Sequence, residues 1–217
     1  IPFFPMNLYY LAGALKEANH TVGIWNQDIH HGNEKALTKI LDENPFDVVG
    51  LGFCAGYYQY EKAKKISEAV NRSSRRKEFT YLLGGHGPGG EAEFFLQKFQ
   101  ADTVIVGDGE KAICEVADGR KDHVIQGQPC TKDESPLGVL DDLFASQIYR
   151  LIRWPTSNRT DFCWPILSSR GCKWHCSFCY RMREGFFERS VEAIICEIRW
   201  LYEHYQITHF QFADELL

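Results

Sequence analysis

The chain has 217 residues, 44% of them apolar, and a formal net charge of −5. This length suits one large or two small domains, and no apolar run is long enough to span a bilayer. The mildly acidic charge gives no broad electrostatic basis for nucleic-acid binding, and eight cysteines, three of them clustered, suit a reducing cytoplasm better than a disulfide framework.

The first half of the chain alternates between strand and helix patterns. Apolar periodicity predicts helices around residues 8–15, 36–41, 63–70 and 91–99. Strands are predicted at Thr21–Asn26, Asp47–Phe53, Phe79–Leu83 and Thr103–Val106. The repeated order predicts an α/β fold in which a parallel, doubly wound, Rossmann-like sheet is covered by helices on both faces.

Polar residues and glycines follow each predicted strand. Such sheets bind ligands outside the carboxyl ends of their strands. The residues at these ends are Asp28, His30 and His31, then Gly52-Phe53-Cys54, then Gly84-Gly85-His86-Gly87-Pro88, and finally Gly107-Asp108-Gly109-Glu110. Glycine permits positive φ and close approach of the backbone to a ligand, so this edge can hold a large flat or nucleotide-like group. Tight turns between strand and helix, which also favour glycine, are the structural alternative.

The order of these turns resembles the cobalamin-binding domain that precedes the barrel in many radical S-adenosylmethionine enzymes. Gly84-Gly85-His86 follows one strand, and Gly107-Asp108-Gly109-Glu110 follows the next. The resemblance implies that the first strand of this domain is missing, because residue 1 already lies in the loop after it. The residues that it implies for cobalamin binding are Asp28, His30, Gly52, Gly84, Gly85, His86, Gly107, Gly109 and Glu110.

The loop that would carry the lower cobalt ligand departs from the Asp-x-His-x-x-Gly pattern of classical cobalamin proteins. Asp28-Ile29-His30 fits, but Asn33 occupies the final glycine position and Gly32 stands one place early. The resemblance therefore leaves two arrangements open. Either His30, oriented by Asp28, binds cobalt, or His30 is a loop residue below an open or water-bound cobalt face.

The middle of the chain is rich in turn residues and predicts a linker over residues 119–164. The cobalamin-binding domain is then expected at 1–118 and a second domain at 165–217.

The second domain contains Cys172, Cys176 and Cys179, whose spacing lets three thiolates converge on one metal centre. A structural zinc site favours four protein ligands, whereas a cubane iron-sulfur cluster can take three cysteines and leave its fourth iron open. The alternatives are a zinc knuckle completed by Cys163 or His175, or three unrelated buried thiols.

The flanking sequence predicts a βαβ unit around the cysteines. Pro165–Ser169 and Ile207–Asp214 read as strands, and Ser190 is a candidate N-cap for an amphipathic helix between them. Parallel pairing would bring the cysteine loop and Asp214-Glu215 to the same carboxyl edge, where barrel-like α/β enzymes carry their chemistry.

The cysteine spacing, with an aromatic residue before the last cysteine, resembles the signature of the radical S-adenosylmethionine family. The resemblance implies a [4Fe-4S] cluster on the three cysteines and S-adenosylmethionine beside Phe178 and Tyr180, with Asp214 or Glu215 at its amino group. It also implies an external electron donor such as flavodoxin or ferredoxin and an anaerobic reaction. Two strands are only the start of a partial TIM barrel, so we expect this chain to be a fragment.

The combined resemblance implies a methyltransferase that acts on an unactivated carbon of a small-molecule or peptide substrate. One S-adenosylmethionine would methylate cobalt, and another would yield the 5′-deoxyadenosyl radical that activates the substrate. Two alternatives remain open. One is a radical cyclisation or rearrangement of the kind found in tetrapyrrole synthesis, and the other is a non-catalytic module that senses corrinoid or redox state.

Overall fold

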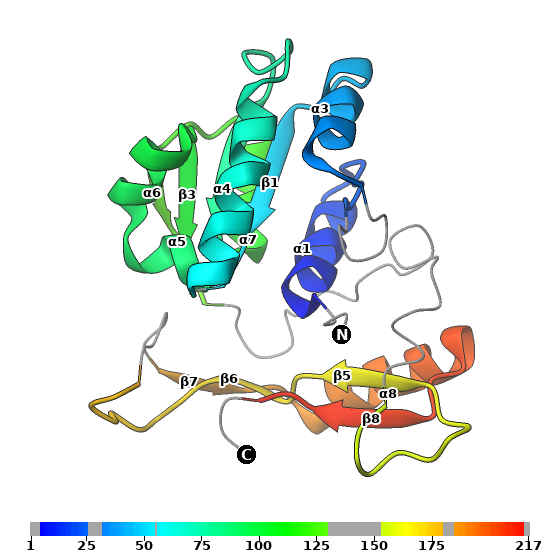
Figure 1. The fold of residues 1–217 in the computed structure, drawn as a ribbon. Coiled ribbons are helices and arrows are strands. Elements are labelled where there is room, and N and C mark those ends of the chain that lie inside the picture. Colours follow the sequence, from blue (N-terminus) through cyan, green and yellow to red (C-terminus); the bar gives the residue numbers. More distant parts are fainter. Residues whose placement is uncertain (1–4, 26–31, 55, 130–152, 180–184, 215–217) are drawn as a thin grey trace. The chain divides into compact units, whose positions relative to one another are not determined.

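A computed structural model describes residues 5–25, 32–54, 56–129, 153–179 and 185–214 (Figure 1). The internal contacts divide the chain into two compact units. One comprises residues 14–129, and the other combines residues 1–13 with residues 130–217. The predicted domain limits of 1–118, 119–164 and 165–217 remain a prediction, and the contact boundary falls inside the first helix.

The 14–129 unit is built on a parallel four-stranded sheet with the order β1-β2-β3-β4. Its strands are β1 (Val48–Gly52), β2 (Thr80–Gly84), β3 (Thr103–Val106) and β4 (Val124–Gln126). Apolar residues dominate these strands because both faces of the sheet are covered. This arrangement confirms the predicted α/β, Rossmann-like fold class.

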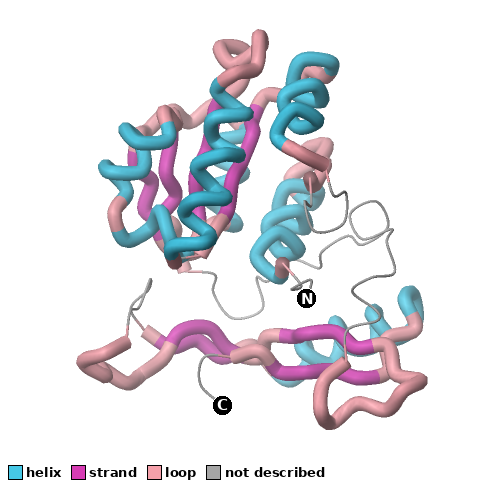
Figure 2. The backbone as a smooth tube through the Cα atoms, viewed as in Figure 1, coloured by secondary structure: helices cyan, strands magenta, loops and turns pink. Residues whose placement is uncertain are grey.

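Two helices of residues 5–129 precede β1 in the sequence, and the others connect successive strands of the sheet (Figure 2). The helices are α1 (Met6–Glu17), α3 (Glu34–Glu43), α4 (Tyr57–Asn71), α5 (His86–Gly90), α6 (Ala92–Phe99) and α7 (Glu110–Ala117). No helix among the described residues is both long and apolar enough to cross a membrane.

Two separate apolar clusters show that the sheet has a core on each face. Tyr81 and Leu83 of β2 pack with residues of α3, α4 and α6, including Phe99. Leu82, between them, packs instead with residues of α7. This alternation follows from the pleat of a strand, in which successive side chains point to opposite faces.

The other unit contains the predicted βαβ arrangement. Strand β5 (Cys163–Ile166) pairs in parallel with β8 (His209–Phe212), and α8 (Val191–Tyr205) lies between them in the sequence. The Ser190 side chain accepts a hydrogen bond from the Ala193 amide, so the predicted N-cap is confirmed. These two strands do not by themselves establish a barrel, and the barrel remains a prediction.

Three local expectations are corrected by the structure. Residues 21–25 form no strand, although Thr21–Asn26 was expected to be one. Strand β4 lies within the segment expected to be an irregular linker, because it pairs with β3 at the sheet edge. The expected strand at Pro165–Ser169 is divided, since β5 ends at Ile166 and β6 (Ser169–Gly171) pairs antiparallel with β7 (Phe186–Glu188). Helices α5 and α7 were not predicted.

An aromatic cluster in the 14–129 unit gives a direct test of this packing. The Phe99 side chain is 2% exposed, and its ring centroid lies 5.3 to 5.9 Å from those of Phe53, Tyr60 and Phe95. We expect Phe99→Ala to lower the free energy of unfolding by about 3 to 5 kcal/mol, because it leaves a cavity. The neighbouring Phe94 is 49% exposed, so Phe94→Ala should cost about 1 kcal/mol or less. Urea unfolding measures both, and equal losses would contradict the described core.

Candidate functional site

The carboxyl ends of β1 and β2 meet in a short network of backbone hydrogen bonds. Gly52 pairs with Gly84 in the register of the two strands. The Phe53 amide donates to the Gly84 carbonyl at 3.2 Å, and the Gly87 amide donates to the Phe53 carbonyl at 3.0 Å. The structure thus brings together Gly52, Gly84, Gly85 and the exposed His86, all predicted from sequence.

Gly85 is required by the shape of this edge. Its φ of +95° lies in a region that other residues rarely adopt, and a Cβ there would stand 2.6 Å from the Phe53 carbonyl oxygen. The glycine therefore permits the close approach of two strand-end loops. The backbone that Gly85 approaches is that of Phe53, as expected for a tight turn. A pocket lies next to this turn and is lined in part by Phe53 and Gly87.

The pocket has a volume of about 350 Å³ and is largely apolar. Its lining residues are Phe53, Cys54, Gly56, Tyr57, Tyr60, Gly87 and Phe95. Tyr57 is 73% exposed and the adjacent Tyr58 is 87% exposed, so aromatic surface is open at the start of α4. A pocket of this size and polarity suits a flat organic group and is too small for a whole corrinoid.

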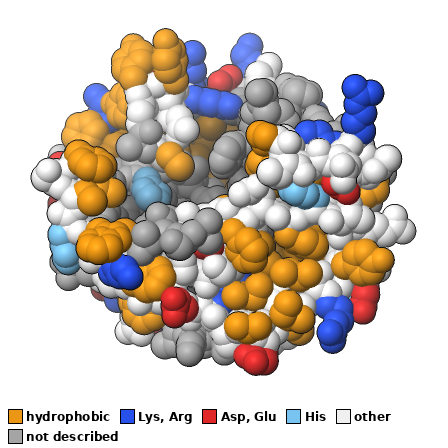
Figure 3. Space-filling model, turned by 90° about the horizontal axis from the view of Figure 1, so that it is seen from below, with side chains coloured by type: hydrophobic (Ala, Val, Ile, Leu, Met, Phe, Trp, Pro, Cys, Tyr) orange, Lys and Arg blue, Asp and Glu red, His pale blue; other side chains and the backbone are white. Residues whose placement is uncertain are grey.

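The sequence predicts Phe53, Cys54 and Gly87 at this edge, but not the aromatic lining by Tyr57, Tyr60 and Phe95. The run Tyr57-Tyr58-Gln59-Tyr60 directly after a strand-end loop was the available signal. Large apolar side chains also reach the surface elsewhere, and hydrophobic atoms form several groups on the face drawn in Figure 3.

The turn after β3 is a tight structural turn. Gly107 has a φ of +90°, and a Cβ at Gly127 would collide with the Asp108 carbonyl oxygen. Glu110 is buried at the first position of α7. Gly107, Gly109 and Glu110 therefore lie at the predicted edge, where the segment after β4 packs against their turn. Their contact with cobalamin stays a prediction.

Asp28 and His30, predicted at the lower cobalt face, lie outside the described residues, as does His31. The neighbouring Asn33 has a clear local role. Its side-chain oxygen accepts a hydrogen bond from the Ala36 amide at 3.0 Å and caps α3. The residue that departs from the classical histidine pattern is thus a helix N-cap.

The cysteine loop leaves β6 through Gly171, whose φ is +79°. Cys172 is half-buried, while Cys176 and Cys179 are exposed. The Cys179 amide donates to the Cys176 carbonyl at 3.1 Å, which forms a turn between these two cysteines. Across the described ranges, no three His, Cys, Asp or Glu side chains converge as a metal site, so the three-cysteine ligand set stays a prediction.

The residues expected beside S-adenosylmethionine are only partly described. Phe178 is 89% exposed on the cysteine loop. Tyr180 and Glu215 lie outside the described residues. Exposed thiols and an exposed aromatic ring on one loop fit a site that takes up a metal cluster and a small-molecule ligand.

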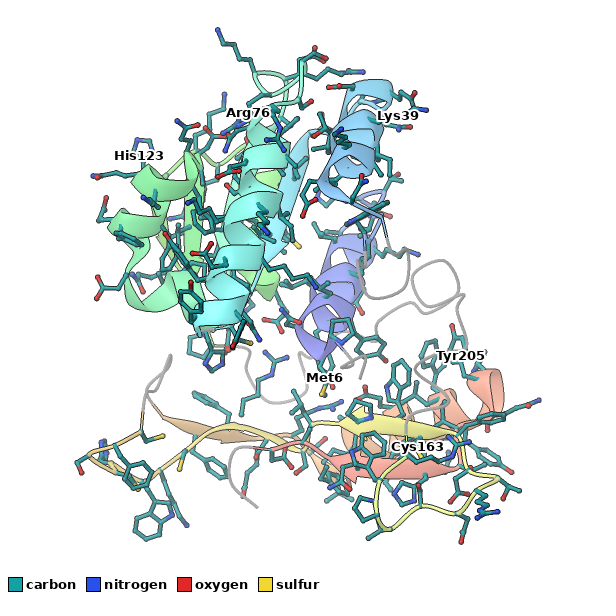
Figure 4. All side chains as sticks on the ribbon, in the orientation of Figure 1. Met6, Lys39, Arg76, His123, Cys163 and Tyr205 are labelled. Atoms are coloured by element: carbon teal, nitrogen blue, oxygen red, sulfur yellow. The ribbon has the colours of Figure 1, made fainter. Side chains whose placement is uncertain are left out.

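Cys163, one of the candidate fourth zinc ligands, belongs to the core of its unit. It is 1% exposed and is the first residue of β5, labelled in Figure 4. Strand β5 ends at Ile166, about 10 Å from Cys163 at the usual rise of 3.3 Å per residue, and the cysteine loop begins only after β6. This position argues against a zinc site completed by Cys163.

Asp214 lies at the carboxyl end of β8, next to the segment that enters the cysteine loop. Its carboxylate accepts hydrogen bonds from the Ser168 amide at 2.7 Å, the Ser168 hydroxyl at 2.6 Å and the Ser169 amide at 2.8 Å. The parallel pairing thus brings Asp214 to the cysteine-loop edge, as predicted. Its observed role is to hold the loop entrance, which we define as residues 167–171. Its contact with S-adenosylmethionine stays a prediction.

Comparisons with known proteins give the family context. A family model described as the B12 binding domain matches residues 2–117. The chain is 27% identical over 204 residues to the hopanoid C-3 methylase of Methylococcus capsulatus, a match that covers 89% of this chain and 38% of that protein.

A solved structure shares the fold across nearly the whole chain. It is the radical S-adenosylmethionine methyltransferase TsrM from Kitasatospora setae with tryptophan substrate and the analogue aza-SAM bound. The TM-score is 0.68 at 16% identity, and the match covers 99% of this chain and 45% of that chain. The chain therefore spans less than half the length of either protein.

These matches confirm the predicted resemblance to radical S-adenosylmethionine enzymes with a cobalamin-binding domain. Because the family model covers residues 2–117, more than half of the 217 residues, the chain belongs to the B12-binding domain family.

Proposed function

We propose that this protein is a cobalamin-dependent radical S-adenosylmethionine enzyme that methylates an unactivated carbon. The observation that carries the proposal is the order of the two sites. A B12-binding domain is followed by a Cys-x3-Cys-x2-Cys loop, which leaves β6 and lies in the sequence between β5 and β8, the two parallel strands of the βαβ unit.

The β1–β2 edge supports the corrinoid part of the proposal. Gly84 and Gly85 keep the strand ends free of side chains, and the adjacent pocket offers an apolar surface of aromatic rings. Such a surface can bury a flat apolar part of a corrinoid. His30, oriented by Asp28, would then approach the metal from a loop outside the described residues.

The cysteine loop supports the second cofactor. Cys172, Cys176 and Cys179 supply three soft thiolate ligands, the number that leaves one iron of a [4Fe-4S] cluster open. When bound, the cluster would provide the electron that cleaves S-adenosylmethionine reductively. Phe178 would cover the bound cofactor, and Asp214 would keep the loop entrance in place.

Methyl transfer is favoured over cyclisation by the relatives, since one is described as a methylase and the other as a methyltransferase. The direct test uses S-adenosylmethionine with a labelled methyl group in the reduced, intact protein that carries this sequence. Transfer of the labelled methyl group from S-adenosylmethionine to a substrate molecule supports methyl transfer. Cleavage of S-adenosylmethionine to 5′-deoxyadenosine without label transfer points to cyclisation or rearrangement. If S-adenosylmethionine is not cleaved, the alternative that fits is a non-catalytic module that senses corrinoid or redox state.

Replacing Cys172, Cys176 and Cys179 together with alanine should abolish iron binding, a loss of about four irons per chain. Corrinoid affinity should change less than about twofold, because the pocket belongs to the other compact unit and nothing in it is altered. Iron analysis and hydroxocobalamin titration measure the two effects. Cys196→Ala, an exposed cysteine on α8, is the control and should retain its iron. A full iron complement in the triple variant would falsify the assignment.

Gly85→Ala should weaken corrinoid binding by about tenfold or more, because the new methyl group forces apart the two strand-end loops. Gly119 provides a matched control. It also has a positive φ, +104°, but it lies in open space after α7. Gly119→Ala should therefore strain the backbone without changing corrinoid affinity. Equal losses in the two variants would show that the β1–β2 edge has no special role.

A further inference from the structure

A buried polar network joins the start of the chain to α8 within the unit that carries the cysteines. Glu197 is 1% exposed, and its Oε1 accepts hydrogen bonds from the hydroxyls of Tyr9 and Tyr10, each at 3.4 Å. Its Oε2 forms an ion pair with the Arg189 guanidinium at 2.5 Å. The side chain of Arg189 is only 7% exposed.

This network continues into the backbone that leads to Cys172. The Arg189 guanidinium donates to the Leu167 carbonyl at 2.8 Å, and the Arg189 amide donates to the Ser168 carbonyl, also at 2.8 Å. The side chain and the backbone amide of Arg189 therefore bind two successive carbonyls. These carbonyls lie between β5 and β6, the strand that leads into the cysteine loop.

A second contact reaches closer to the cysteines. The Arg170 guanidinium lies over the ring of Tyr10, 5.2 Å from its centroid. Arg170 is in β6 and stands two residues before Cys172. Tyr10 thus contacts the network at two points, with its hydroxyl on Glu197 and its ring on Arg170.

The charges in this network stabilise one another because they are withdrawn from water. Burial and the nearby Glu197 carboxylate raise the pKa of Tyr10, so its hydroxyl remains a hydrogen-bond donor across the physiological range. Removing one partner of a buried ion pair leaves a charge without compensation. The network is therefore sensitive to small changes, and any rearrangement acts on the loop entrance that it holds.

We propose that Tyr10 and Glu197 are positioning residues for the cysteine loop, acting through Arg170 and Arg189. They fix the backbone from Leu167 to Gly171 and so determine the position of Cys172. The first turns of α1 lie in the stretch matched by the B12-binding domain model, yet their contacts belong to the cysteine-bearing unit. The part of this proposal that concerns the cluster rests on the proposed function.

The test uses the intact protein and four variants. Glu197→Gln keeps the shape of the side chain but removes its charge, and Tyr10→Leu removes both the hydroxyl and the ring. Glu203→Gln and Tyr202→Phe, which change an exposed glutamate and an exposed tyrosine of α8, are the controls. Amide hydrogen exchange is measured first, on iron-free protein, for residues 167–171 and Arg189.

We expect exchange at these amides to rise about tenfold in Glu197→Gln and Tyr10→Leu, since the loss of a charged hydrogen bond is of that size. The amides of α4 in the other unit should be unaffected, and both control variants should resemble the unaltered protein. Unchanged exchange at 167–171 in the first two variants would overturn the proposal. An equal rise throughout the protein would do the same, because it would indicate global destabilisation.

The second measurement is the electron paramagnetic resonance spectrum of the reconstituted, reduced protein. A looser loop entrance should broaden the cluster signal in Glu197→Gln and Tyr10→Leu and leave it sharp in the controls. An unchanged signal would limit the network to a structural role and overturn the positioning claim. If the unaltered protein binds no cluster, the proposed function fails, and the exchange data still decide whether the network fixes the loop entrance.

Tyr10→Phe covers the case in which the stronger substitutions prevent folding. It retains the ring below Arg170 and removes only the hydroxyl that donates to Glu197. Exchange at Arg189 should then rise while the β6 amides near Arg170 stay protected. If the Arg189 amide and the β6 amides all stay as protected as in the unaltered protein, the proposal is overturned.

Discussion

Both halves of the chain depend on parallel strand pairing, because parallel strands end together at one edge of a sheet. In the 14–129 unit this pairing aligns Gly52 with Gly84 and lets Gly85 approach the backbone of Phe53. In the other unit it aligns the ends of β5 and β8, so that Asp214 reaches the serines before the cysteine loop. The same geometric rule thus brings the glycine turns together in one unit and supports the cysteine loop in the other.

The cysteine loop depends on more than that pairing. A metal-binding loop needs a rigid base because small shifts of its first ligand change the geometry of the whole centre. Here Asp214 holds the amides of Ser168 and Ser169, and Arg189 holds the carbonyls on the same short segment. The amide donors of this segment are therefore held by the Asp214 carboxylate, and its carbonyl acceptors by the guanidinium and the backbone amide of Arg189; the exposed Cys176 and Cys179 lie beyond that base.

Local signals predicted much of the fold. Ser190 followed by an amphipathic run specified a helix start, and the nearly continuous apolar strands specified a parallel sheet covered on both faces. Strand β4 escaped prediction because three residues give little periodicity, and their pairing with β3 depends on tertiary context. Residues 21–25 have a strand-like composition but form no strand pairing in the structure.

The candidate sites show the same division. The cysteine loop and the glycine turns could be proposed as candidate sites from the sequence, because each lies within a few residues of sequence. The network of Tyr9, Tyr10 and Glu197 could not, since its members are separated by more than 180 residues and meet only after folding. A glutamate and two tyrosines on helices resemble ordinary surface or core residues until their partners are known.

The proposed chemistry requires that a corrinoid and a [4Fe-4S] cluster bind to the same chain. The most direct measurement is anaerobic reconstitution of the intact protein with iron, sulfide and hydroxocobalamin, followed by metal analysis and an ultraviolet-visible spectrum. We expect about four irons and about one corrinoid per chain. Zinc without iron would contradict the cluster assignment, and iron without corrinoid would contradict the role given to the β1–β2 edge.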